Sequence, residues 1–368
     1  MYSEKELVGI AKRENNNRRK YLVVNRLQGK HIPVIPSKAI NMFDCLAQML
    51  IEKYSDEKLL LIGFAETATA IGAAVATQMD CYYMQTTREV INNVDYLFFS
   101  ETHSHATEQK LVKNDIESII YEIDRIIFIE DEVTTGNTIM NIVKLIQNEY
   151  KNSKSKFSIA SILNGMNSDA EKLYRSREIG IHYLVKTNHD TYDAVTEKFV
   201  GDGKYNQSIL LDKQAEYKTK TYGEYVNARR LVKSSVYLKA CEKLWDNIKG
   251  DNDIKSNIKI LVLGTEEFMY PSIFIAHKME LVGCDVRFHA TTRSPIVVSS
   301  EEDYPLHTRY ELCSLYDAER TTFVYELTKY DRVFIITDAL NDKEVGLNSL
   351  IFALTKNKND NISVIRWC

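Results

Sequence analysis

The sequence lacks a long apolar run, closely paired cysteines and a large excess of charge. No stretch reaches the roughly 18 apolar residues that a membrane-spanning helix needs, and the N-terminal Met-Tyr-Ser-Glu-Lys-Glu has no signal-peptide core. The six cysteines include no Cys-x-x-Cys pair, so neither a zinc site nor a disulfide framework is expected. A formal charge of −4 argues against a nucleic-acid partner held by bulk electrostatics. We therefore expect a cytoplasmic protein with no membrane or nucleic-acid partner.

Length and composition indicate a globular chain. At 368 residues, of which 44% are hydrophobic and 27% charged, the chain is long enough for two domains, each with its own core.

The most informative segment, residues 126–138, reads Ile-Ile-Phe-Ile-Glu-Asp-Glu-Val-Thr-Thr-Gly-Asn-Thr. Its four leading apolar residues predict a strand of a parallel sheet buried on both faces. Ligands bind beyond the carboxyl ends of such strands, where Glu130 and Asp131 could accept hydrogen bonds from two ribose hydroxyls. A helix N-terminus follows, and its dipole favours a phosphate; its hydroxyls and N–H groups come from Thr134, Thr135, Gly136, Asn137 and Thr138.

These features predict a site for a phosphorylated sugar, and the alternative is an ordinary capped helix after a buried strand. The segment resembles, without a gap, the 5-phosphoribosyl 1-pyrophosphate (PRPP) motif of type I phosphoribosyltransferases. The resemblance implies transfer of the phosphoribosyl group to a base-like acceptor, with Mg²⁺ held mainly by ligand oxygens and no dedicated protein metal site.

The same order of motifs occurs twice in the chain. Gly63-Phe-Ala-Glu, Thr86-Thr-Arg and Asp124-Arg recur as Gly264-Thr-Glu-Glu, Thr291-Thr-Arg and Asp331-Arg, each within strand–helix–strand patterns. We interpret this as duplication of one α/β unit; the alternative is that such patterns recur by chance in α/β chains. The predicted fold is a parallel sheet flanked by helices, followed by a degenerate copy.

The second copy lacks the paired acids and the Thr-Thr-Gly turn, so it cannot bind PRPP in the same way. Its candidate site is Thr292, Arg293 and Ser294, where hydroxyls around an arginine suit an anion or a neighbouring subunit. A helix cap beside an aromatic cluster explains the same residues.

Other segments supply candidates for pyrophosphate binding and catalysis. The strand–loop–helix junction at Ala65, Glu66 and Thr67 offers backbone N–H groups to pyrophosphate, and Arg88 lies where related enzymes have a basic residue that contacts it. His103 and His105 fall where the family has a flexible loop, and are candidates for pyrophosphate contact or proton transfer. A His-x-His metal site, solvated histidines and, for Arg88, a surface salt bridge are the alternatives.

The N-terminal segment Tyr21 to Val34 is strand-like and ends in Gly-Lys-His. In this family an N-terminal hood grips the acceptor, which makes Lys30 and His31 candidates for acceptor binding. The alternative is that Lys30 and His31 belong to a basic turn on the surface.

Nearly the whole chain resembles orotate-transferase-like phosphoribosyltransferases that carry a C-terminal TRSP domain, through Gly29-Lys-His-Ile-Pro, His103-Ser-His-Ala-Thr-Glu and Thr292-Arg-Ser-Pro. That group is associated with tellurium-resistance clusters, and the resemblance implies a role in making a nucleotide-like metabolite.

We predict a phosphoribosyltransferase domain with its hood at residues 1–215, a helical linker at 216–257 and a TRSP domain at 258–368. A homodimer is compatible with this prediction. The alternatives are a non-catalytic PRPP- or nucleotide-sensing protein and a PRPP synthetase, for which no ATP-binding segment is visible.

Overall fold

A computed structural model describes residues 2–14, 19–99, 109–207, 217–340 and 344–368. Two compact units are assembled from interleaved segments of the chain. Unit 1 comprises Met1–Glu4, Asn41–Asn188 and Val226–Lys239, and unit 2 comprises Lys5–Ile40, His189–Tyr225 and Ala240–Cys368. The units therefore do not follow one another along the chain, whereas the predicted domains did.

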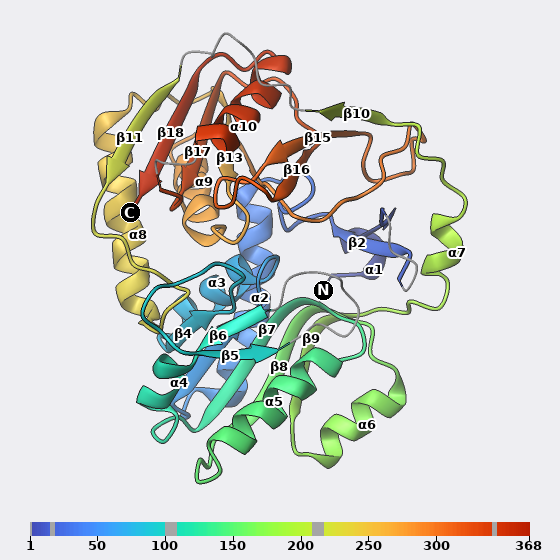
Figure 1. Cartoon of the computed structure of the whole chain (residues 1–368), viewed down its shortest axis with the longest axis vertical. Coiled ribbons are helices and arrows are strands. Elements are labelled where there is room, and N and C mark those ends of the chain that lie inside the picture. The colour runs from blue at the N-terminus through green and yellow to red at the C-terminus, as the bar shows by residue number, and fades with distance from the viewer. Residues whose placement is uncertain (1, 15–18, 100–108, 208–216, 341–343) are drawn as a thin grey trace. The chain divides into compact units, whose positions relative to one another are not determined.

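Unit 1 is built on a sheet with the strand order β12-β4-β3-β7-β8-β9 (Figure 1). Pairing is parallel from β4 to β9, and β12 joins β4 antiparallel at one edge. The parallel sheet flanked by helices confirms the predicted fold class. The strands are β3 (Leu59–Gly63), β4 (Tyr82–Gln85), β7 (Arg125–Val133), β8 (Lys156–Asn164), β9 (Gly180–Lys186), β12 (Val232–Lys233) and the antiparallel pair β5 (Tyr96–Phe99) and β6 (Gln109–Val112).

Unit 2 contains a parallel sheet of order β11-β18-β17-β13-β14 (Figure 1). A smaller sheet, β10-β15-β16, and the antiparallel hairpin β1-β2 complete its strands. These strands are β1 (Val8–Lys12), β2 (Tyr21–Asn25), β10 (Lys204–Gln207), β11 (Lys218–Tyr222), β13 (Lys259–Gly264), β14 (Asp285–Ala290), β15 (Thr308–Cys313), β16 (Thr321–Tyr325), β17 (Arg332–Thr337) and β18 (Ile362–Trp367).

The helices connect and cover these strands. In chain order they are α1 (Glu4–Leu7), α2 (Pro36–Tyr54), α3 (Thr69–Met79), α4 (Lys113–Ile119), α5 (Asn137–Glu149), α6 (Ser168–Ser176), α7 (Tyr192–Thr196), α8 (Ser234–Asp251), α9 (Tyr270–Leu281) and α10 (Glu344–Lys356). Among the described residues, none of the helices has the length and apolarity needed to cross a membrane.

The two main sheets repeat one topology. The order β4-β3-β7-β8 in unit 1 corresponds to β14-β13-β17-β18 in unit 2. Helix α3 follows β3 along the chain, as α9 follows β13. The hydrogen bonds repeat as well. Asp124 Oδ2 accepts the Lys58 N–H at 2.7 Å, and Asp331 Oδ2 accepts the Lys259 N–H at 2.8 Å. This agreement in topology and in detail supports the duplication read from the sequence.

The edge strand of the unit 2 sheet, β11, lies where the sequence predicted a helical linker. The predicted helical linker covers residues 216–257, but α8 begins at Ser234 and ends at Asp251. Residues Lys218–Tyr222 instead form β11, which pairs in parallel with β18 at the position that β9 occupies beside β8. Pairing with a strand more than a hundred residues away decided this conformation, and local periodicity carries no information about it.

The N-terminal segment belongs to unit 2 rather than to the first sheet. Arg13 forms an isolated bridge with Ile296, and Val34 forms one with Phe288. Apolar residues of the β1-β2 hairpin share a core with residues far along the chain. The hairpin contributes Ala11, Leu22 and Val24, and the distant segments contribute Ile296, Val298, Tyr304, Leu306, Phe323 and Tyr325. These contacts lie within unit 2, and the predicted domain bounds stay a prediction.

Candidate functional site

The paired carboxylates lie where β7 outruns its neighbour. β3 ends at Gly63, opposite Ile129, whereas β7 continues to Val133 with β8 as its partner. Glu130 and Asp131 therefore lie within the strand, past the end of β3, rather than after the strand as the sequence suggested. Both residues are half-buried. They lie at the carboxyl end of the sheet, where ligands bind in parallel sheets, although β7 itself continues past them.

A hydrogen bond joins the second carboxylate to the loop that follows β3. Thr67 Oγ1 donates to Asp131 Oδ1 at 2.7 Å. The pKa of Asp131 is raised to about 6. Burial is the main cause and the nearby Glu132 charge acts in the same direction, while the Thr67 hydrogen bond lowers the pKa. Asp131 is thus ionised at neutral pH and becomes protonated in mild acid.

The same loop is held by two residues that the sequence reading missed. The Ala65 N–H donates to Thr86 Oγ1 at 2.8 Å, and the Thr86 hydroxyl donates to Gln109 Oε1 at 2.6 Å, all within the buried part of the unit. Arg88 lies two residues after Thr86, beyond the end of β4 at Gln85. The recurrence of Thr-Thr-Arg in both copies was the signal that could have identified Thr86 as a support for the loop.

Glycine is required where β7 turns into α5. Gly136 has φ of +75°, and a Cβ there would lie 2.7 Å from the Tyr174 hydroxyl. The Tyr174 hydroxyl donates to the Gly136 carbonyl. α5 begins at Asn137, and its first backbone hydrogen bond runs from the Met140 N–H to the Gly136 oxygen. The preceding N–H groups form the helix end at which a phosphate is favoured; Thr134, Thr135 and Thr138 add hydroxyls beside them.

Of the four other predicted residues, two lie outside the described residues and two belong to unit 2. His103 and His105 lie outside the described residues. Lys30 and His31 lie in unit 2 and are 0% and 3% exposed. The Lys30 ammonium donates to two backbone carbonyls of unit 2, at 2.7 and 2.9 Å. Acceptor binding by these two residues stays a prediction, and the ammonium is engaged in holding loops of unit 2.

The candidate residues of the second domain, Thr292, Arg293 and Ser294, also make contacts with other residues of the protein. Thr292 is buried and pairs with Phe323 through the backbone. Arg293 Nε donates to Glu266 Oε2 at 2.7 Å, and Nη2 lies 3.4 Å from Glu267 Oε1. The Ser294 N–H donates to Thr292 Oγ1. The structure thus gives this cluster protein partners rather than an open surface.

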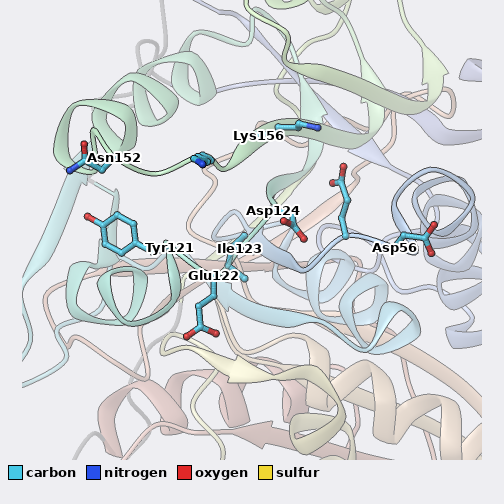
Figure 2. A pocket seen from close by; sticks show the side chains of 9 residues that line it. Asp56, Tyr121, Glu122, Ile123, Asp124, Asn152 and Lys156 are labelled. Carbon is cyan, nitrogen blue, oxygen red and sulfur yellow. The ribbon is translucent and has the colours of Figure 1, made fainter.

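A cavity of about 570 Å³ opens at the opposite end of the first sheet (Figure 2). It is lined by residues that precede strands or begin them, including Asp124 before β7 and Lys156 at the start of β8. None of the predicted site residues lines it. Among the described residues, no group of three or more His, Cys, Asp or Glu side chains is placed to hold a metal ion.

Two family models match separate parts of the chain. A family model described as "Phosphoribosyl transferase" matches residues 7–188, and one described as "TRSP domain C terminus to PRTase_2" matches residues 230–354. No protein with a curated description matches the chain.

Several solved structures resemble part of the chain. The adenine phosphoribosyltransferase of Rhodothermus marinus is 13% identical over 50% of this chain and 96% of its own, with a TM-score of 0.36. The Trypanosoma brucei enzyme, solved with AMP, pyrophosphate and ribose-5-phosphate, is 11% identical over 50% and 77%, with a TM-score of 0.36. A Staphylococcus aureus hypoxanthine phosphoribosyltransferase is 15% identical over 43% and 77%, with a TM-score of 0.28. Similarity at this level does not identify a substrate.

Burial of Asp131, opposed by the Thr67 hydrogen bond, produces the pH dependence that we expect for PRPP binding. Because the carboxyl pKa is raised to about 6, the ionised form is lost as pH falls through that value, and affinity should fall with it. Thr67→Val removes the interaction that lowers this pKa, so the acid limb should move to higher pH. Thr67→Ser keeps the hydroxyl and should keep the wild-type midpoint. Calorimetric titration with Mg²⁺-PRPP on both sides of the pKa measures this; coincident midpoints for all three proteins would contradict it.

Replacing Gly136 should destabilise unit 1. Gly136→Ala combines positive φ with a clash against Tyr174, and we expect a loss of about 1–3 kcal/mol in the free energy of unfolding. Gly250→Ala is the matched control because it lies in α8 with nothing within 4 Å of the added Cβ, and it should gain roughly 0.5–1 kcal/mol. Urea denaturation followed by circular dichroism compares the two; a Gly136→Ala protein as stable as wild type would refute the requirement.

Proposed function

Because the chain belongs to the phosphoribosyl transferases that carry a C-terminal TRSP domain, we propose that residues 63–67, 88 and 130–138 of unit 1 form the site that transfers the phosphoribosyl group of PRPP to a base-like acceptor. The observation that supports this most directly is the hydrogen bond between Thr67 and Asp131. It joins the loop proposed for pyrophosphate to the acids proposed for ribose, so one ligand can span both.

The proposed reaction is a displacement at C1 of PRPP. A ring nitrogen or similar nucleophile of the acceptor forms the new bond to C1. The C1–O bond breaks, and its electron pair leaves with pyrophosphate, while the acceptor loses a proton. Positive charge develops on the ribose ring during this step, so nearby carboxylates stabilise it.

Each segment has a separate task in this proposal. Glu130 and Asp131 orient the ribose hydroxyls and support the developing charge. The α5 N-terminus at residues 134–138 anchors the 5-phosphate, and that remote binding energy positions C1. Backbone N–H groups of the 63–67 loop and the Arg88 guanidinium hold pyrophosphate as it leaves.

Mg²⁺ fits this donor set as an ion carried largely by the substrate. The proposed site has hard oxygen donors in two carboxylates but not the larger acidic cluster of a dedicated metal cage in the described residues. Bound Mg²⁺ would neutralise charge on the pyrophosphate group. The residues of this chain would orient that complex through Glu130, Asp131 and the 63–67 loop.

The proposed acceptor is a base-like nucleophile. Lys30 and His31 stay the candidates for its recognition, and the Lys30 ammonium also donates to two backbone carbonyls of unit 2. A screen of purine, pyrimidine and other nitrogen heterocycles with Mg²⁺ and PRPP would define the acceptor class.

Removing the charge of the paired acids should abolish most of the activity. Glu130→Gln with Asp131→Asn should lower turnover more than tenfold, a barrier increase on the order of 2–4 kcal/mol. Glu122→Gln with Asp124→Asn makes the same charge change at the other end of β7, beside the cavity of Figure 2, and should retain activity. Pyrophosphate release is the measurement, and unchanged turnover in the first variant would refute the assignment.

A binding measurement separates catalysis from sensing. Mg²⁺-PRPP at a hundred times its dissociation constant should stabilise wild type by about 2.7 kcal/mol and leave the Glu130→Gln/Asp131→Asn variant unaffected. Stabilisation without pyrophosphate release for any acceptor would favour a PRPP-sensing protein. Absence of stabilisation in wild type would mean that the motif no longer binds PRPP.

A further inference from the structure

Unit 2 carries a glutamate at the place where unit 1 has a small residue in its pyrophosphate loop. The Ala65 N–H donates to Thr86 Oγ1 at 2.8 Å, and in the second copy the Glu266 N–H donates to Thr291 Oγ1 at 3.0 Å. Glu266 is therefore the counterpart of Ala65. By the same register Arg293, two residues after Thr291, is the counterpart of Arg88.

The Glu266 carboxylate is held as a bound oxyanion would be. Its side chain is 1% exposed. Oε2 accepts from Arg293 Nε at 2.7 Å and from Arg320 Nη1 at 3.0 Å, and Oε1 accepts from Ser314 Oγ at 2.5 Å. Two guanidinium groups and a hydroxyl around one small anion form an arrangement that also suits phosphate or a free carboxylate.

The acid that follows β17, Asp338, also has both carboxylate oxygens hydrogen-bonded within unit 2. Asp338 lies seven residues after Asp331 (338 − 331), as Asp131 lies seven after Asp124 (131 − 124). Its two carboxylate oxygens accept hydrogen bonds from the Tyr316 and Tyr225 hydroxyls, both at 2.6 Å. Phenol hydroxyls thus meet this carboxylate in the way that sugar hydroxyls would meet Asp131.

We propose that unit 2 is a closed copy in which the chain supplies its own substitute for a sugar-phosphate ligand. The Glu266 carboxylate takes the place of the anion, and the Tyr225 and Tyr316 hydroxyls take the place of the sugar hydroxyls. The comparison rests on the proposed role of the unit 1 site. The contacts within unit 2 stand independently of that role.

Two consequences follow from internal occupation. The wild-type chain binds one PRPP, in unit 1, because the corresponding groups of unit 2 are already satisfied. Removing the Glu266 carboxylate takes away the acid that Arg293 and Arg320 share and leaves them with Glu267 at 3.4 Å and Asp317 at 3.7 Å. Because the two guanidinium groups are only 11% and 19% exposed, this loss destabilises the unit until another small oxyanion enters.

Chemical rescue tests the second consequence in the full-length protein. Glu266→Ala should lower the melting temperature in chloride, and added formate at equal ionic strength should restore part of the loss in proportion to the logarithm of its concentration. Formate supplies the missing carboxylate without resembling the larger ligands of unit 1. Wild type should show no difference between the two salts.

Matched variants locate the rescue. Glu319→Ala removes an exposed glutamate beside Arg320 and should behave as wild type. Adding Arg293→Gln to Glu266→Ala should abolish the response to formate, because the clamp is then incomplete. The same melting temperature in both salts for Glu266→Ala, or equal rescue in the double variant, would overturn the proposal.

Binding stoichiometry provides a test that needs no change in unit 2. Calorimetry with Mg²⁺-PRPP should give one site per chain in wild type and none after Glu130→Gln/Asp131→Asn. Two sites in wild type, or one remaining in the variant, would overturn internal occupation. Complete absence of binding in wild type would instead refute the proposed function, and the formate experiment would still decide the state of unit 2.

Discussion

The parallel register between β3 and β7 is the constraint on which the first site depends. Gly63 pairs with Ile129, so the loop after β3 begins beside the point where β7 presents its acids. This pairing brings Thr67 within 2.7 Å of Asp131 although the two residues are 64 positions apart. A shift in this register would separate the loop from the acids and turn their side chains to the other face of the sheet.

The two copies use one backbone plan with different side-chain chemistry at the strand ends. In unit 1, a threonine hydroxyl reaches Asp131 across the loop. In unit 2, Phe268 stands at the corresponding position, four residues after Gly264 as Thr67 is four after Gly63. Phenylalanine cannot donate, and tyrosines from elsewhere in the unit hydrogen-bond to Asp338 instead. A shared fold therefore does not imply a shared ligand.

Local patterns predicted the repeated elements closely. The strand expected from the four apolar residues 126–129 lies within β7, and the helix expected after Thr134-Thr135-Gly136 begins at Asn137. Buried parallel strands have continuous apolar sequences that can be read without knowing their neighbours. The β11 strand lacks such a run because most of its residues are exposed, and its pairing with β18 was not visible.

The sequence by itself determined the α/β class, the duplicated order of strands and helices, and the residue types of the PRPP motif, because apolar periodicity and turn chemistry are local properties. Tertiary structure alone decided which partners those residues meet. Lys30 lies against carbonyls 236 and 261 positions away, and Glu266 receives arginines from two separate segments. Buried polar groups must find partners wherever the chain brings them, so their roles depend on long-range packing that no local pattern records.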